Sequence, residues 1–283
     1  MKKIGFILIS VLVLCTSCSK VKQAIGSDKQ LADSTEVADE NNAKAEPELT
    51  KVSFCSVDSM VQLSAEIPHF EDSRLNDSIL AYLDRNFNGY NDLYKQYNDA
   101  EKAFKKGGEK RWNKLKSEIE ELRSEWDEGD EIPDYVFQWE YTDEVVVEEI
   151  NENYVTFVNT GYEYQGGAHG ISWINGTTLD RQTGSVVTEK ILKDTSSQAF
   201  QNLLKEKLGE YFENDDLESI LFNNPNEQDI PVGNIRIYKG TIIIQYQSYE
   251  IAPYAAGLPV ATITFDEIKP FLTSEGLRLT GMK

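Results

Sequence analysis

Residues 135–164 read YVFQWEYTDEVVVEEINENYVTFVNTGYEY and carry the clearest strand signal in the chain. In their first part, aromatic and β-branched residues alternate with more polar ones, which is the period-two pattern of a strand with one buried face. Residues 151–153 then supply a polar turn, and residues 154–164 return as a second strand. The stretch therefore predicts an antiparallel pair of strands.

Helical periodicity precedes this pair. Before Gly107-Gly108, apolar residues recur at intervals of three or four, which predicts an amphipathic helix that these two glycines end. Asp72 or Ser73 can cap its start, and Gly89 can kink it. A second apolar stripe over residues 112–126 predicts another helix, and the two helices can pack as a hairpin.

Further strands are predicted ahead of these helices. Residues 52–67 have the mixed alternation of strands, ended by Pro68. Cys55 falls in the same phase as Val57, which predicts a small buried residue there rather than a nucleophile.

The C-terminal part combines one helix with several strands. The patterns predict a strand over residues 171–179, a turn over 180–184, a helix over 200–211, a hairpin over 235–246, and a strand over 260–265 with a short final helix capped by Asp266. Strands and helices are segregated, with no regular strand–helix–strand rhythm. The sequence therefore predicts an α+β fold in which antiparallel sheets pack with amphipathic helices.

The start of the chain has the features of an export signal. Two lysines precede an apolar run, residues 4–14, that is shorter than the roughly 20 residues of a membrane-spanning helix. Small residues directly before Cys18 fit lipoprotein processing, so we predict a lipoprotein signal peptide over residues 1–17 and lipidation of Cys18. An ordinary signal peptide is the alternative. Ser19, in place of an aspartate, favours the outer membrane without indicating which face displays the protein.

Residues 18–50 are predicted to form the lipid anchor and a flexible tether. No aromatic residue occurs between residues 19 and 50, so this segment cannot bury enough apolar surface to offset its ordering entropy. After removal of the signal peptide, Cys18 and Cys55 are the remaining cysteines. Because Cys18 carries lipid in this interpretation, we expect no disulfide to hold the fold.

The chain is strongly acidic, with a formal net charge of −20. Such a charge excludes nucleic acid as a partner, because nucleic-acid binding needs a basic surface. It can attract a basic protein through the summed field, or it can serve solubility alone.

The inventory of catalytic residues is small. His69 and His169 are the two histidines, and no nucleophile elbow, zinc-protease motif or phosphate-binding loop occurs. The carboxylate cluster Glu144, Glu148 and Glu149 is of a kind that an acidic surface produces by chance. We expect no cofactor and no metal, and whether the chain is an enzyme stays open, with non-catalytic the favoured interpretation.

Two segments stand out as candidate recognition loops. The first, residues 162–170, reads YEYQGGAHG, and the second, residues 249–257, reads YEIAPYAAG. Adjacent glycines permit a tight turn or a bulge, and the rings around them can present amphipathic contacts. A purely structural turn is the alternative. The candidate binding residues are Tyr164, Gly166, Gly167, His169, Tyr249, Tyr254 and Gly257.

Together these two segments resemble the RsiV-like extracellular domain. The resemblance extends over residues 51–272. That domain occurs in an anti-sigma factor that binds lysozyme, and as a non-catalytic partner domain in a peptidoglycan deacetylase. The resemblance implies two subregions, here an N-terminal one over residues 51–184 with a helical insertion and a C-terminal one over residues 185–283.

Three functions follow as hypotheses. The first is a non-catalytic envelope lipoprotein that binds a lysozyme-like protein or peptidoglycan, with the membrane contacted through the lipid anchor only. The second is a cell-wall hydrolase that uses His169 with a carboxylate such as Asp180, which requires the two groups to lie within hydrogen-bond reach of the reacting atoms. The third is a structural lipoprotein without a small ligand.

Overall fold

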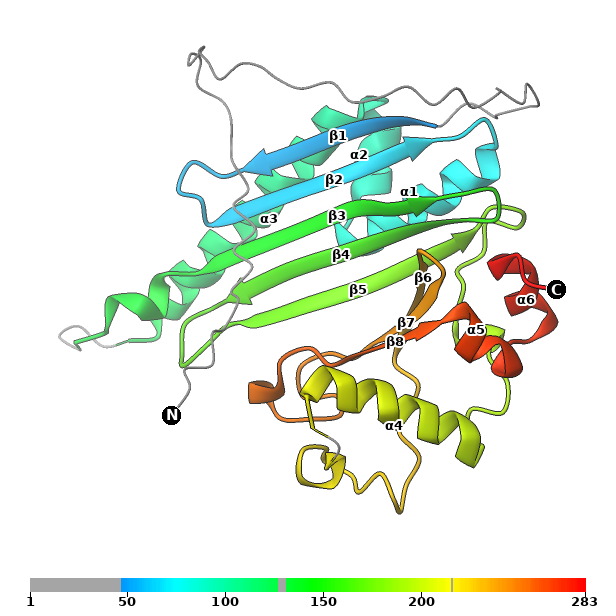
Figure 1. Cartoon of the computed structure of the whole chain (residues 1–283). Coiled ribbons are helices and arrows are strands. Elements are labelled where there is room, and N and C mark those ends of the chain that lie inside the picture. Colours follow the sequence, from blue (N-terminus) through cyan, green and yellow to red (C-terminus); the bar gives the residue numbers. More distant parts are fainter. Residues whose placement is uncertain (1–46, 127–130, 215) are drawn as a thin grey trace, which may run out of the picture. The chain divides into compact units, whose positions relative to one another are not determined.

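The computed structural model describes residues 47–126, 131–214 and 216–283. The predicted signal peptide, Cys18 and most of the predicted tether lie outside these residues. Within them, the strands form a five-stranded sheet of order β1-β2-β3-β4-β5 and a three-stranded sheet of order β6-β7-β8 (Figure 1). The larger sheet comprises β1 (Glu48–Cys55), β2 (Val61–His69), β3 (Glu140–Ile150), β4 (Tyr154–Tyr164) and β5 (Ile171–Asp180).

The α+β class is confirmed, and the predicted pair β3–β4 is antiparallel, as are β1–β2 and β4–β5. The pair β2–β3 is parallel, which the sequence did not indicate. A helical segment between these two strands brings the chain back to the end of the sheet where β2 began, as a parallel pair requires. β1 begins at Glu48, within the segment assigned to the tether.

Two details of the strand predictions are wrong. β3 begins at Glu140 and not at residue 135, because Asp134–Phe137 form a 3-10 turn, η1, after Pro133. The Trp139 indole nitrogen donates to the carbonyl of Val136 at 2.9 Å and closes this turn. Cys55 is exposed, because Val52 and Phe54 point their side chains toward the core and the next residue of the strand faces the other way.

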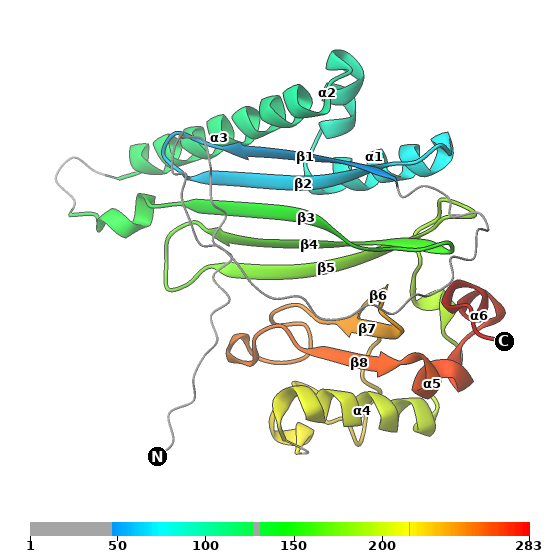
Figure 2. The same cartoon turned by 45° about the horizontal axis from the view of Figure 1, so that its top comes forward.

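Three helices cover the larger sheet (Figures 1 and 2): α1 (Ser73–Asn86), α2 (Tyr90–Tyr97) and α3 (Ala100–Ser124). α3 contacts β1 and β2, α1 contacts β2, and α2 packs on the other two helices. Asp72 caps α1 as predicted, since its side chain accepts from the backbone nitrogen of Arg74 at 2.9 Å. Gly89 has a φ of 86° and breaks the predicted first helix into α1 and α2. The core beneath these helices includes Leu63, Ile79, Leu83, Tyr90, Phe104, Leu115, Val145 and Phe157.

The prediction that Gly107-Gly108 ends a helix is wrong, because both residues lie inside α3. Gly108 is buried where α3 crosses β1. A Cβ atom added to it would lie 2.2 Å from Cγ of Phe54, so only glycine lets the helix approach the strand this closely.

The smaller sheet, which is antiparallel, packs against α4 (Gln198–Phe212). The predicted 235–246 hairpin is confirmed as β6 (Asn234–Tyr238) and β7 (Thr241–Gln245), followed by β8 (Val260–Thr264), α5 (Phe265–Ile268) and α6 (Ser274–Thr280). Thr264, not Asp266, caps α5, through a capping box with Glu267. A second core includes Phe200, Leu204, Leu208, Ile237, Ile242, Ile244, Tyr246 and Ile263.

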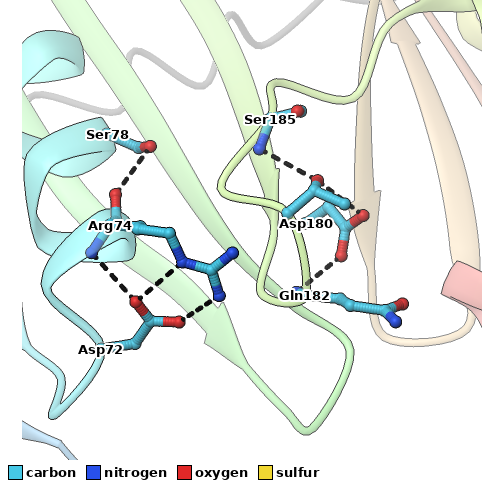
Figure 3. Close-up of polar contacts among 7 residues, drawn as sticks. Asp72, Arg74, Ser78, Asp180, Gln182 and Ser185 are labelled. Atoms are coloured by element: carbon cyan, nitrogen blue, oxygen red, sulfur yellow. Dashed lines mark hydrogen bonds and ion pairs between the residues drawn. The ribbon is translucent and has the colours of Figure 1, made fainter.

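Buried polar contacts join the two sheets. The Thr156 hydroxyl donates to the carbonyl of Ile237 at 2.7 Å, and the backbone nitrogen of Ile237 donates to the Thr178 hydroxyl at 3.0 Å. In the turn after β5, Asp180 accepts from the backbone nitrogen of Gln182 at 2.8 Å (Figure 3). Its carboxylate also pairs with Arg278 of α6 at 2.6 Å. The hydrogen bonds to Ile237 connect the two sheets, and the Asp180–Arg278 pair connects β5 to α6.

Candidate functional site

The two segments that the sequence singled out meet in space. His169, in the loop between β4 and β5, stacks on Tyr254, in the loop between β7 and β8, with ring centroids 3.9 Å apart and an interplanar angle of 21°. The Tyr254 hydroxyl donates to the carbonyl of Gly170 at 2.8 Å. A stacked ring pair and a hydrogen bond thus connect a loop of the larger sheet to a loop of the smaller one.

Two glycines shape the first loop. Gly166 and Gly167 have φ values of 80° and 95°, in the left-handed region that favours glycine. Gly166 also lies so close to η1 that an added Cβ atom would be 2.9 Å from the carbonyl oxygen of Val136. The Tyr164 hydroxyl donates to the carbonyl of Gly167 at 3.0 Å. These three residues therefore shape the loop, and His169 presents the ring.

The second loop is braced in a similar way. Tyr249 has a φ of 66° and is 53% exposed as a residue, with its ring centroid 5.8 Å from that of Tyr254. Gly257 has a φ of 74°. Beside it the Tyr211 hydroxyl donates to the carbonyl of Ala256 at 3.0 Å, which ties the loop to α4. Tyr249 and Tyr254 therefore present rings, and Gly257 shapes the backbone.

Tyr162 belongs to the same group of rings, although it was not among the predicted binding residues. A Cβ atom added to Gly170 would lie 2.5 Å from the Tyr162 hydroxyl, so this phenol rests on the loop backbone. Burial raises the pKa of Tyr162, and the neighbouring Glu140 and Tyr254 raise it further. The spacing of two from Tyr164 was the available signal, because alternate residues of a strand share a face. We call Tyr162, His169, Tyr249 and Tyr254 the aromatic cluster.

The structure separates His169 from Asp180. The residues lie at opposite ends of β5, which corresponds to roughly 30 Å at the rise of a strand. Asp180 is buried, and burial acts to raise its pKa. Hydrogen bonds from Arg278, Gln182 and Thr183 outweigh that effect and hold the pKa below its ordinary value. The proposed catalytic pairing of His169 with Asp180 is therefore wrong, and Asp180 is a structural anchor.

The carboxylate cluster noted in the sequence has structural partners. Glu144 accepts a hydrogen bond from the Ser64 hydroxyl, Glu148 pairs with Arg236 at 3.0 Å, and Glu149 accepts from the Tyr154 hydroxyl at 3.0 Å. In the part of the chain that the structure describes, no group of three or more His, Cys, Asp or Glu side chains is arranged to hold a metal ion. The same residues include no helix that is long and apolar enough to cross a membrane.

Two family models match successive parts of the chain, and the aromatic cluster contains residues from both parts. Residues 55–172 match the family model described as deacetylase PdaC, and residues 189–266 match the model of a protein of unknown function, DUF3298. His169 comes from the first match and Tyr254 from the second. Two successive parts of the chain are therefore similar to two different family models, and both parts contribute rings to the aromatic cluster.

One solved structure shows the same fold, and a second aligns more loosely. A member of the DUF3298 family from Bacteroides fragilis superposes with a TM-score of 0.68 at 20% sequence identity, covering 85% of this chain and 99% of that one. A DUF3298 family protein from Pseudomonas aeruginosa aligns with a TM-score of 0.46 at 18% identity, covering 81% and 94%. Comparison with curated proteins gave no match.

Proposed function

We propose that this protein is a non-catalytic binding module of the cell envelope and that the aromatic cluster is its recognition surface. The observation that carries the proposal is the stacking of His169 on Tyr254 across the two matched regions, with the exposed ring of Tyr249 beside them. Tyrosine rings bury a large area with few rotatable bonds and have a hydroxyl that can bond a partner, which is why they dominate protein recognition sites.

The charge of the chain favours a basic protein of the lysozyme class as the partner. With a net charge of −20, the protein attracts a basic partner and raises the rate of encounter. This choice agrees with the resemblance of the two loops to a lysozyme-binding ectodomain. Peptidoglycan is the second candidate, because exposed ring faces such as that of Tyr249 can also stack on sugar rings.

Envelope localisation is part of the proposal. We propose that Cys18 carries the lipid that holds the chain to the outer membrane, and that the described residues extend from this anchor. Substitution of Cys18 by alanine is expected to abolish labelling with a lipid precursor and to release the protein from the membrane fraction. Persistent membrane association of that variant would contradict the anchor.

Binding at two salt concentrations tests the function. Residues 47–283 are titrated with a lysozyme, and are separately sedimented with purified peptidoglycan, at low salt and at about 0.5 M salt, where the Debye length is only a few ångströms. The proposal expects binding to one of the two targets that persists at high salt, because ring contacts do not depend on long-range charge. Binding that disappears with salt, or no binding to either target, would overturn it and favour a structural lipoprotein.

A further inference from the structure

A cavity of about 190 Å³ lies between the helices and the larger sheet, away from the aromatic cluster. Its apolar walls come from β2, β3, α3 and the α1–α2 connection, and it shares no lining residue with the aromatic cluster. The apolar lining residues are Leu63, Phe87, Tyr90, Phe104 and Tyr141. Such a wall favours an apolar ligand body of small size.

The polar part of the lining is basic. Lys110, Arg111 and Lys114 of α3 line the cavity together with Asn86 and Asn88, and no aspartate or glutamate does. Glu163 pairs with Arg111 and Glu118 pairs with Lys114, whereas Lys110 makes no ion pair with any described residue, so one positive charge at the cavity is left uncompensated. The local field therefore favours an anion in this cavity, against the sign of the molecule as a whole.

Arg111 is held in place at the wall of the cavity. Its guanidinium lies over the Tyr141 ring, 4.1 Å from the centroid, and its terminal nitrogen pairs with Glu163 at 3.2 Å. The Nε atom of Arg111 is buried and out of reach of a ligand, so a ligand in the cavity meets the guanidinium at its terminal nitrogens.

We propose that this cavity binds a small amphiphilic carboxylate. The apolar body lies against Leu63 and Phe104, and a carboxylate oxygen accepts a hydrogen bond from a terminal nitrogen of the Arg111 guanidinium. Lys110 stands at the exposed rim and contributes attraction to the headgroup. The site is separate from the aromatic cluster, so its occupation and the binding of an envelope partner are independently testable.

Calorimetry with octanoate tests the proposal on the full chain in which Cys18→Ala prevents lipidation. Octan-1-ol and octylammonium serve as neutral and cationic probes of the same length. The expected result is that octanoate binds at least about tenfold more tightly than either probe, because one charge-assisted hydrogen bond is worth that factor. No octanoate binding, or equal binding of octanoate and octan-1-ol, would overturn the proposal.

Two arginine variants test whether octanoate binds in the cavity beside Arg111. Arg111→Gln is expected to weaken octanoate binding about tenfold. Arg123→Gln is the matched control, because Arg123 also lies on α3 with its guanidinium over a ring, Phe137, but outside the cavity. It is expected to leave the affinity unchanged. Equal loss in the two variants would contradict the assignment.

A variant of an exposed residue tests the proposal without depending on whether Arg111→Gln folds. Lys110 is exposed and makes no ion pair with any residue that the structure describes, so Lys110→Glu is expected to fold normally. It should weaken octanoate binding about threefold or more at low salt, with the difference shrinking as salt is added. An unchanged affinity at low salt would contradict the proposed position of the carboxylate.

Discussion

The adjacent glycines of α3 should respond to alanine in opposite directions. An added Cβ atom at Gly107 would lie 3.6 Å from Cδ1 of Leu93, which is an ordinary contact, whereas at Gly108 it would lie 2.2 Å from Cγ of Phe54. Alanine in a helix interior gains about 1 kcal/mol over glycine. Gly107→Ala should therefore raise the free energy of unfolding by about 0.5–1 kcal/mol.

Gly108→Ala gains the same helix propensity but must displace Phe54 or the helix. Overpacking of this kind costs typically about 1–3 kcal/mol, and here the ring and its Cβ atom both lie within 3 Å of the new atom. We expect a net loss of about 1–2 kcal/mol. For a domain of this size that corresponds to a fall in Tm of roughly 2–8 °C, against a small rise for Gly107→Ala.

Urea unfolding of residues 47–283 followed by circular dichroism measures both effects. A double-mutant cycle isolates the cause. In a Phe54→Ala background the ring contacts at 2.2 and 2.3 Å are absent and only the contact with the Cβ atom of residue 54, at 2.9 Å, remains, so the cost of Gly108→Ala should fall clearly. The reasoning would be refuted if Gly108→Ala stabilised the native chain, or if its cost were the same with and without the Phe54 ring.

Two further predictions concern buried carboxylates. Burial raises the pKa of Asp143 to about 6, against hydrogen bonds from Asn159 and Tyr141 that lower it. The folded state therefore holds a proton that the unfolded state has lost between about pH 4 and 6, so stability should fall with rising pH across that window, by at most about 1.4 kcal/mol per pH unit. Asp143→Asn should flatten this slope in urea unfolding at a series of pH values, and an unchanged slope would show that another group is responsible. Arg278→Ala should lower stability by about 2 kcal/mol at pH 7, because it leaves buried Asp180 without its ion-pair partner; a loss below about 0.5 kcal/mol would mean that Gln182 and Thr183 suffice.

The sequence predicted an element correctly where apolar periodicity and turn residues are enough to determine it. The β3–β4 pair, the α4 helix and the β6–β7 hairpin follow from apolar periodicity and turn residues, and the structure has all three. Gly107-Gly108 misled the prediction, because a glycine in a helix pattern indicates an end unless a neighbouring element requires close approach. That requirement comes from Phe54, which is remote in sequence, and no local pattern contains it.

The candidate site was also predicted only in part, because some of its features depend on residues remote in sequence. The glycines at 166, 167 and 257 were identified from the turn geometry they permit, and each has a positive φ. The stacking of His169 on Tyr254 joins residues 85 positions apart, and only the resemblance grouped their loops before the structure was known. The separation of His169 from Asp180, in contrast, follows from the strand predicted over residues 171–179, which the structure has as β5.

Substitution of alanine for two rings of the aromatic cluster tests most directly the claim that this cluster is the recognition surface. The affinity of the partner that binds at high salt is measured by calorimetry for the wild-type chain, for Tyr249→Ala with His169→Ala, and for Tyr97→Ala. Tyr97 is a tyrosine of α2 outside the aromatic cluster and serves as the control. The account predicts a loss of about tenfold or more for the double variant and none for Tyr97→Ala, because recognition rings carry most of an interface's energy. Equal affinities for all three proteins would contradict the claim that the aromatic cluster is the recognition surface.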